Sequence, residues 1–203
     1  RFAADYRPFS ELGLVLARQG KLDEAVTLFR QALAIYPDEV DTLCRLGTAL
    51  SEQGELAEAE AQFRQAIALD PDSVKAHCGL GRTLRMANQL GEAQAEFEKA
   101  LRFDPHDVAA RNELGIALLN QGKVDEAVAA FKTALAEGPK DASAEIKFAS
   151  ALAALGRTTE AAEHFRRALA LDPDNAVARK NLDLLMDNAD RVPIPTPGDE
   201  PPR

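Results

Sequence analysis

The chain has 203 residues, 46% of them hydrophobic but only 5% aromatic, and a formal net charge of −9. This acidic balance argues against nucleic acid as the main partner, because phosphate binding needs clustered Lys and Arg. No apolar run approaches the ~18–20 residues that cross a bilayer, so this segment is not expected to insert into a membrane. Residue 1 is Arg rather than Met and no signal-peptide pattern precedes it, which indicates a processed or excised piece.

A unit of 34 residues recurs in phase five times along the chain. In residues 40–73, apolar residues spaced three and four apart form two sets, one on each side of Gly54. Each set predicts an amphipathic helix, and Gly54 supplies the turn between them. Pro71 ends the second helix because proline has no N–H to donate. Since neither helix buries its apolar face alone, the pairs are expected to stack on one another.

The same residue types mark every unit. A phenylalanine lies in each second helix, a proline follows it, and a glycine or an asparagine marks each turn. These positions are Phe29, Phe63, Phe97, Phe131 and Phe165; Pro37, Pro71, Pro105, Pro139 and Pro173; and Gly20, Gly54, Asn88, Gly122 and Gly156.

The predicted organisation is a lead-in, five helix pairs, a closing helix and a tail. The closing helix has no second helix beside it, so we expect it to cover the last apolar face. The tail is rich in proline and cannot bury a core, so it is expected to be disordered. The boundaries are residues 1–5 for the lead-in, 6–39, 40–73, 74–107, 108–141 and 142–175 for the pairs, 176–188 for the closing helix and 189–203 for the tail.

The junction between the fourth and fifth units departs most from the pattern. Glu137 and Gly138 replace the apolar-then-polar pair that precedes the proline elsewhere, and Thr158 stands where the earlier units have Leu or Val. Losing one buried leucine contact costs about 2–5 kcal/mol if nothing fills the space. We therefore expect the array to fray here first.

This pattern resembles the tetratricopeptide repeat over residues 6–175. The resemblance implies an all-α fold, a tetratricopeptide-repeat α-solenoid that forms a right-handed superhelix. It also implies that the first helices line a concave groove that binds a protein or peptide. The carboxylate clamp with which some members hold chaperone C-termini is absent, because only Lys75 matches among its positions, which are Ser10, Leu14, Arg45, Lys75 and Gly79.

If the first helices line the groove, its middle is basic inside an acidic shell. The first helix of the third unit carries Lys75, Arg82 and Arg85 and no Asp or Glu. Such a patch would attract an acidic peptide or a chain terminus; the competing interpretation is ordinary solubilising charge. The candidate partner-binding residues are Arg45, Thr48, Lys75, Cys78, Arg82, Arg85, Asn112, Lys147 and Ser150.

The histidines and cysteines predict no metal site. His77 replaces an apolar residue and is expected to be partly buried, whereas His106 and His164 are expected to be solvated. Cys44 and Cys78 occupy the same position in adjacent units, about 10 Å apart, which is too far for a disulfide. We expect both thiols to be free and to face the groove, which favours a reducing compartment such as the cytoplasm.

No catalytic ordering of Ser, His and Asp, phosphate-binding loop or nucleotide fingerprint is present, so neither an enzyme nor a cofactor is expected. The main hypothesis is a non-catalytic protein–protein interaction scaffold or adaptor. One alternative is the recognition arm of a larger enzyme or membrane-anchored protein. Another is a self-association module that stacks through Phe2, Tyr6 and Phe9. The richness in Ala, Leu and Arg suits a bacterial protein.

Overall fold

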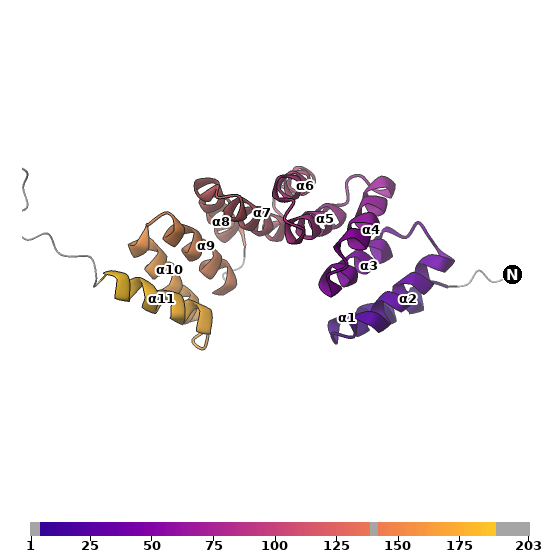
Figure 1. Ribbon diagram of the computed structural model, residues 1–203, viewed down its shortest axis with the longest axis horizontal. Coiled ribbons are helices and arrows are strands. Elements are labelled where there is room, and N and C mark those ends of the chain that lie inside the picture. The colour runs from indigo at the N-terminus through magenta and orange to yellow at the C-terminus, as the bar shows by residue number, and fades with distance from the viewer. Residues whose placement is uncertain (1–4, 139–141, 190–203) are drawn as a thin grey trace, which may run out of the picture. The chain divides into compact units, whose positions relative to one another are not determined.

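The computed structural model describes residues 5–138 and 142–189, and every regular element in these residues is an α-helix (Figure 1). The chain divides into two compact units, Arg1–Ala130 and Phe131–Arg203, with the division inside α8. Within the described ranges, no helix is long and apolar enough to span a membrane. The helices are α1 (Arg7–Arg18), α2 (Leu22–Ile35), α3 (Val40–Gln53), α4 (Leu56–Leu69), α5 (Val74–Met86), α6 (Leu90–Phe103), α7 (Val108–Asn120), α8 (Val124–Glu137), α9 (Ala142–Ala154), α10 (Thr158–Leu171) and α11 (Ala176–Ala189).

The predicted all-α fold is confirmed, with one helix pair for each 34-residue unit and a closing helix, α11, that packs on α10. This closing helix ends at Ala189, one residue beyond its predicted end. Residues 1–4 of the lead-in, Pro139 and residues 190–203 of the tail lie outside the described residues. Thr158 is the first residue of α10 and is exposed, and fraying near it stays a prediction.

The helices α3, α5, α7 and α11 begin at side-chain caps that lie at the same position of the repeat, whereas α1 has no such cap. A side-chain oxygen at the position before the helix accepts a hydrogen bond from a backbone N–H three residues on, which satisfies a donor that the helix leaves unpaired. In α7, for example, Asp107 Oδ1 accepts from the Ala110 N–H at 2.9 Å. Such caps stand at Glu39, Ser73, Asp107 and Asn175.

The turns between the helices of a pair adopt the left-handed backbone conformation that the sequence predicts for them. Gly54 has a φ of +86°, and Asn88 replaces glycine at the same position with a φ of +61°. A side chain in this region costs roughly 1–2 kcal/mol, and asparagine tolerates it better than most residues do. The turn at Asn88 is therefore the most strained of these turns.

Replacing Asn88 with alanine is expected to lower the free energy of unfolding by about 1 kcal/mol, because alanine lacks the polar side chain that helps asparagine adopt this conformation. Chemical denaturation followed by circular dichroism measures the change. Gln89→Ala is the matched control, since Gln89 is exposed and has a negative φ of −88°. An Asn88→Ala variant as stable as the control would contradict the argument.

Glycines of consecutive first helices receive the phenylalanine rings of the second helices. Phe63 of α4 is buried, and a Cβ atom on Gly47 of α3 would lie 2.8 Å from its ring. A Cβ atom on Gly79 of α5 would lie 2.2 Å from the same ring, closer than real Cβ contacts ever come. The ring of Phe63 is thus held between two helices that only glycine allows to approach so closely.

Buried hydroxyl pairs join the successive first helices. Ser10 of α1 lies 2.7 Å from Thr42 of α3, and Ser51 of α3 lies 2.7 Å from Thr83 of α5, measured between the hydroxyl oxygens. Each pair satisfies polar atoms that would be costly to bury alone. The pairs therefore fix how α1, α3 and α5 lie against one another.

Among the described residues, each compact unit holds a buried histidine–glutamate pair, and the two residue types have exchanged helices between the units. In the first unit, His77 of α5 contacts Glu96 of α6 at 2.7 Å (Nδ1 to Oε2). In the second unit, Glu145 of α9 contacts His164 of α10 at 2.6 Å (Oε2 to Nδ1). Glu145 lies two 34-residue periods after His77, and His164 lies two periods after Glu96, so the same two positions are used in opposite order.

The burial of the three histidines differs in part from the prediction. His77 is buried more deeply than expected, and His106 is exposed as predicted. The prediction for His164 was wrong, because its side chain is only 16% exposed. It packs edge-on against the Phe148 ring at 4.6 Å, and the buried Glu145 carboxylate draws the ring inward.

Candidate partner-binding face

In the first compact unit α3 contacts both α1 and α5, and we name the surface that these three helices form the first-helix face. This face contains two adjoining hollows of about 470 and 110 Å³, which share Thr48 and Glu52. The larger is lined by Leu14, Ala17, Arg18, Phe29, Arg45, Thr48, Ala49, Glu52 and Lys75. The smaller is lined by Thr48, Ser51, Glu52, Phe63, Gly79, Arg82, Arg85 and Met86.

Five of the predicted partner-binding residues line these hollows: Arg45, Thr48, Lys75, Arg82 and Arg85. Asn112 is partly exposed on α7, and Lys147 and Ser150 are partly exposed on α9 in the second compact unit.

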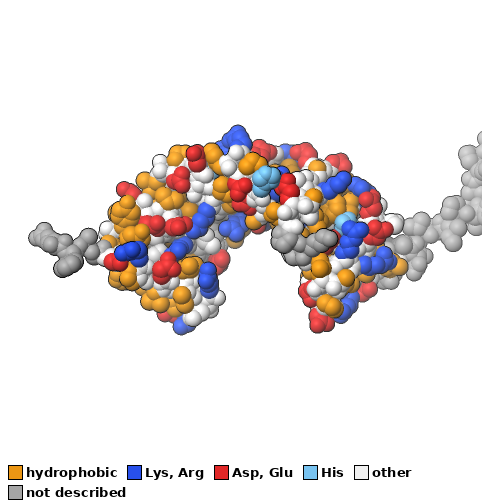
Figure 2. All heavy atoms as spheres, turned by 180° about the vertical axis from the view of Figure 1, so that it is seen from behind, with side chains coloured by type: hydrophobic (Ala, Val, Ile, Leu, Met, Phe, Trp, Pro, Cys, Tyr) orange, Lys and Arg blue, Asp and Glu red, His pale blue; other side chains and the backbone are white. Residues whose placement is uncertain are grey.

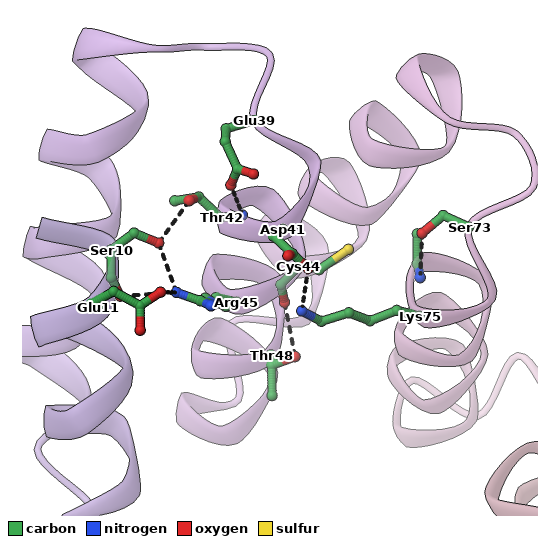
Figure 3. A network of polar contacts seen from close by, with 11 residues as sticks. Ser10, Glu11, Glu39, Asp41, Thr42, Cys44, Arg45, Thr48, Ser73 and Lys75 are labelled. Carbon is green, nitrogen blue, oxygen red and sulfur yellow. Dashed lines mark hydrogen bonds and ion pairs between the residues drawn. The ribbon is translucent and has the colours of Figure 1, made fainter. Parts of the chain in front are cut away.

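Two of the predicted cations are neutralised by carboxylates of the preceding first helix (Figure 3). Arg45 Nη1 donates to Glu11 Oε1 at 2.8 Å and also reaches the Ser10 hydroxyl. Lys75 Nζ donates to Asp41 Oδ1 at 2.6 Å, and this hydrogen bond lowers the pKa of the Asp41 carboxyl. Both cations are therefore held by groups within the array.

Arg85 is neutralised from the following first helix instead, because its Nη2 lies 3.3 Å from Glu113 Oε2 of α7. The basic middle was predicted from the charges of α5 and from Arg45 of α3, and carboxylates of the neighbouring first helices pair with three of these cations. The predicted basic middle is thus partly neutral. On the face that Figure 2 shows, acidic and basic side chains are likewise interspersed.

Three charged groups that line the hollows have no hydrogen-bond or ion-pair partner among the described residues. They are Arg18 on α1, Glu52 on α3 and Arg82 on α5, and two of them were missed by the sequence analysis. The sequence could have indicated Arg18 and Glu52, because both are charged residues and they occupy the same position in consecutive units. Charged groups without an internal partner are the ones that a bound molecule can use.

Cys44 and Cys78 were predicted to face the groove, and neither lines the two hollows. Cys44 is fully buried, and its backbone carbonyl accepts a hydrogen bond from the Thr48 hydroxyl at 2.9 Å. Cys78 is partly buried, and both thiols are free. Within the described residues, no group of three or more His, Cys, Asp or Glu side chains could hold a metal ion.

Both thiols are expected to react slowly with iodoacetamide at pH 8 in the folded protein. Burial raises the pKa of Cys44 to about 11 and that of Cys78 to about 12, so almost no reactive thiolate is present. Mass spectrometry of alkylated protein measures the reaction, and the unfolded protein in guanidinium is the control. Rapid labelling of either cysteine in the folded protein would contradict this expectation.

Sequence models of the tetratricopeptide repeat match residues 6–72, 44–108, 87–142 and 112–176, and the chain belongs to this family. Proteins of this family are generally non-catalytic scaffolds for protein interactions, and the fold supports that general function here. A search of curated proteins finds no match to this sequence.

Solved structures share the fold at low sequence identity. TTC0263, a thermophilic TPR protein of Thermus thermophilus, is 22% identical with a TM-score of 0.75, over 89% of this chain and 98% of its own. PilF of Pseudomonas aeruginosa is 20% identical with a TM-score of 0.79, over 92% and 86%. YrrB, described as a TPR protein with an unusual peptide-binding site, is 22% identical with a TM-score of 0.66, over 85% and 89%.

Proposed function

We propose that this protein is an interaction scaffold that binds a protein or peptide segment on the first-helix face of its first compact unit. The observation that carries the proposal is the pair of adjoining hollows along α1, α3 and α5. Pockets that combine an apolar floor with a few polar groups are typical binding sites. YrrB, a protein of the same fold, is described as having a peptide-binding site.

The proposed mechanism is the docking of an extended segment across the successive first helices. Leu14, Ala17 and Phe29 offer an apolar floor in the larger hollow, and Phe63 lies beneath the smaller one. Charged side chains around these floors give specificity through complementary groups on the partner. No chemical step is needed for this function, and we assign no catalytic role to any residue.

Filling the hollows tests this proposal. Thr48 lines both hollows and is only partly buried, so Thr48→Trp should block both. Ala61→Trp is the matched control, because it adds the same side chain at an exposed position of α4 that lines neither hollow. The probe is a displayed library of random 12-residue peptides selected on the native protein, followed by affinity measurements by fluorescence anisotropy.

We expect the selected peptides to lose most of their affinity for Thr48→Trp and to keep it for Ala61→Trp. Circular dichroism checks that both variants fold. If Thr48→Trp does not fold, Glu52→Trp blocks the same hollows from an exposed position. Peptides that bind the blocked and native proteins equally would overturn the proposal, as would a selection that yields no binding peptide.

Self-association is a second candidate function, favoured by the exposed apolar face of α1. Leu12 is 51% exposed, whereas Leu46 and Leu80 at the same position of the next two units are 2% and 1% exposed. An apolar side chain that is exposed here but buried at the same position of the next two units can pack against another molecule. The predicted Phe2 contact lies outside the described residues. A monomer mass that does not change with concentration in analytical ultracentrifugation would exclude this candidate.

A further inference from the structure

We infer that the first-helix face recognises an extended segment with an acidic, a basic and a second acidic side chain spaced about three residues apart. The inference rests on the proposed function and names the chemistry of the partner. It follows from three charged groups that stand on three successive helices, together with the distance between such helices.

The charged groups of the first-helix face that are not in internal ion pairs alternate in sign from α1 to α3 to α5. Arg45, Lys75 and Arg85 are each bonded to a carboxylate of a neighbouring first helix. Among the described residues that line the hollows, the charged groups without such a partner are Arg18, Glu52 and Arg82. They lie on α1, α3 and α5, so the face presents a positive, a negative and a positive group in helix order.

The distance between helices sets the spacing of the complementary charges. Packed helices lie about 8–10 Å apart, and an extended chain in the polyproline II conformation rises about 3.1 Å per residue with three residues per turn, so that every third side chain points to the same side. A segment that crosses from α1 to α5 therefore meets the next helix about every third residue. Because the acidic–basic–acidic order is symmetric, either chain direction satisfies the same three groups.

Gly79 gives the face a second feature beside Arg82. Arg45 and Glu113 occupy the same position in the neighbouring units, and both extend long side chains toward their ion-pair partners. At Gly79 no side chain covers the floor, and the small hollow reaches Phe63 there, with Met86 at its edge. This surface fits an apolar side chain of the bound segment, placed next to the acidic residue of that segment that pairs with Arg82.

Charge reversal on the face tests the inference. Random 12-residue peptides are selected separately on the native protein and on Glu52→Lys, and the selected sequences are compared. We expect acidic–x–x–basic–x–x–acidic spacing among peptides selected on the native protein. On Glu52→Lys we expect the central basic residue to be replaced by an acidic one.

Affinity measurements on one peptide from the native selection give the matched comparison. We expect Arg82→Glu to weaken binding by about tenfold, since it replaces one exposed ion pair by a repulsion. Arg102→Glu is the control, because Arg102 is an exposed arginine of α6 outside the hollows and the variant has the same net charge. We expect this control to change the affinity by less than twofold.

The outcomes separate this inference from the proposed function. The inference would be overturned if Thr48→Trp abolished peptide binding but the selected peptides showed no common order of charges. It would also be overturned if peptides selected on Glu52→Lys showed the same order of charges as those selected on the native protein. The proposed function would stand in both cases. Equal effects of Arg82→Glu and Arg102→Glu would also overturn the inference, because only net charge would then matter. Peptides that neither Thr48→Trp nor Glu52→Trp affects would overturn both.

Discussion

Replacing Gly79 with alanine is expected to lower the free energy of unfolding by about 1–3 kcal/mol, although alanine is the better helix former. The new Cβ atom would meet the ring of Phe63 at 2.2 Å. That ring cannot move away, because it is buried and Gly47 of α3 packs against it as well. The added methyl group therefore pushes α5 away from α4 and strains the packing of both.

The presence of Phe63 decides the sign of this effect. In a Phe63→Ala background, which itself costs about 3–5 kcal/mol, the clash is gone. Gly79→Ala should then stabilise the protein by roughly 0.5–1 kcal/mol through helix propensity alone. Gly91→Ala in α6 is the matched control, because a Cβ atom there meets nothing within 4 Å and should stabilise either background.

Urea denaturation of the four proteins in this double-mutant cycle measures the coupling between the two positions. A Gly79→Ala effect that is the same with and without Phe63 would show that the ring does not constrain the helix. The expected reversal of sign would show that glycine is retained at this position for packing. Since Gly79 also opens the smaller hollow, the same residue shapes both the core and the candidate binding face.

Replacing Glu96 with alanine is expected to cost about 3 kcal/mol, because it leaves His77 buried without its carboxylate partner. The side chain of His77 is 4% exposed and that of Glu96 is 10% exposed. The other ring nitrogen of His77, Nε2, donates to the Pro71 carbonyl at 2.9 Å. Lys99 donates to the second carboxylate oxygen of Glu96 at 2.6 Å. Removing the glutamate therefore leaves two buried or half-buried groups unpaired.

The preceding unit supplies the control for this prediction. Leu43 and Gln62 stand there at the positions of His77 and Glu96. The double variant His77→Leu/Glu96→Gln installs that combination and is expected to be more stable than Glu96→Ala, since no unpaired buried histidine remains. Thermal denaturation at pH 7 compares the variants. A double variant less stable than Glu96→Ala would show that the cost does not come from an orphaned histidine.

The same pair predicts the pH dependence of stability. Burial alone would raise the pKa of Glu96, but the hydrogen bonds from Lys99 and His77 outweigh it and hold the pKa below its ordinary value of 4.5. The unfolded chain therefore takes up this proton first as the pH falls, and stability contributed by Glu96 is lost below pH 4.5. Glu96→Gln should show a shallower loss of stability on acidification in urea titrations at several pH values. An unchanged slope would contradict the assignment.

The fold could be predicted from the sequence because its determinants repeat at one fixed period. Each unit specifies the same geometry, because its determinants act within the unit or on the next helix. These determinants are the phenylalanines, the left-handed turns and the helix-ending prolines. Asn88 could be placed in a turn for this reason, although it is not glycine. Local patterns of this kind need no knowledge of distant partners.

The site was only partly predictable, since its charges depend on partners in other units. Arg45 and Lys75 were read as free cations because their own helices were considered one at a time. Their partners, Glu11 and Asp41, lie 34 residues away, at the same position of the preceding unit. Comparing charges along each repeat position, rather than along each helix, would have found both pairs. It would also have drawn attention to Arg18 and Glu52.

His164 was misread for a related reason, and its exchanged pairing with Glu145 has a consequence for how helices find each other during folding. A chain of near-identical helices risks docking α5 on α10 or α9 on α6. The first error would bring His77 to His164, and the second would bring Glu145 to Glu96, so two like groups would be buried together. We therefore expect the opposite orders to favour the docking of α5 on α6 and of α9 on α10 over the two mismatched alternatives.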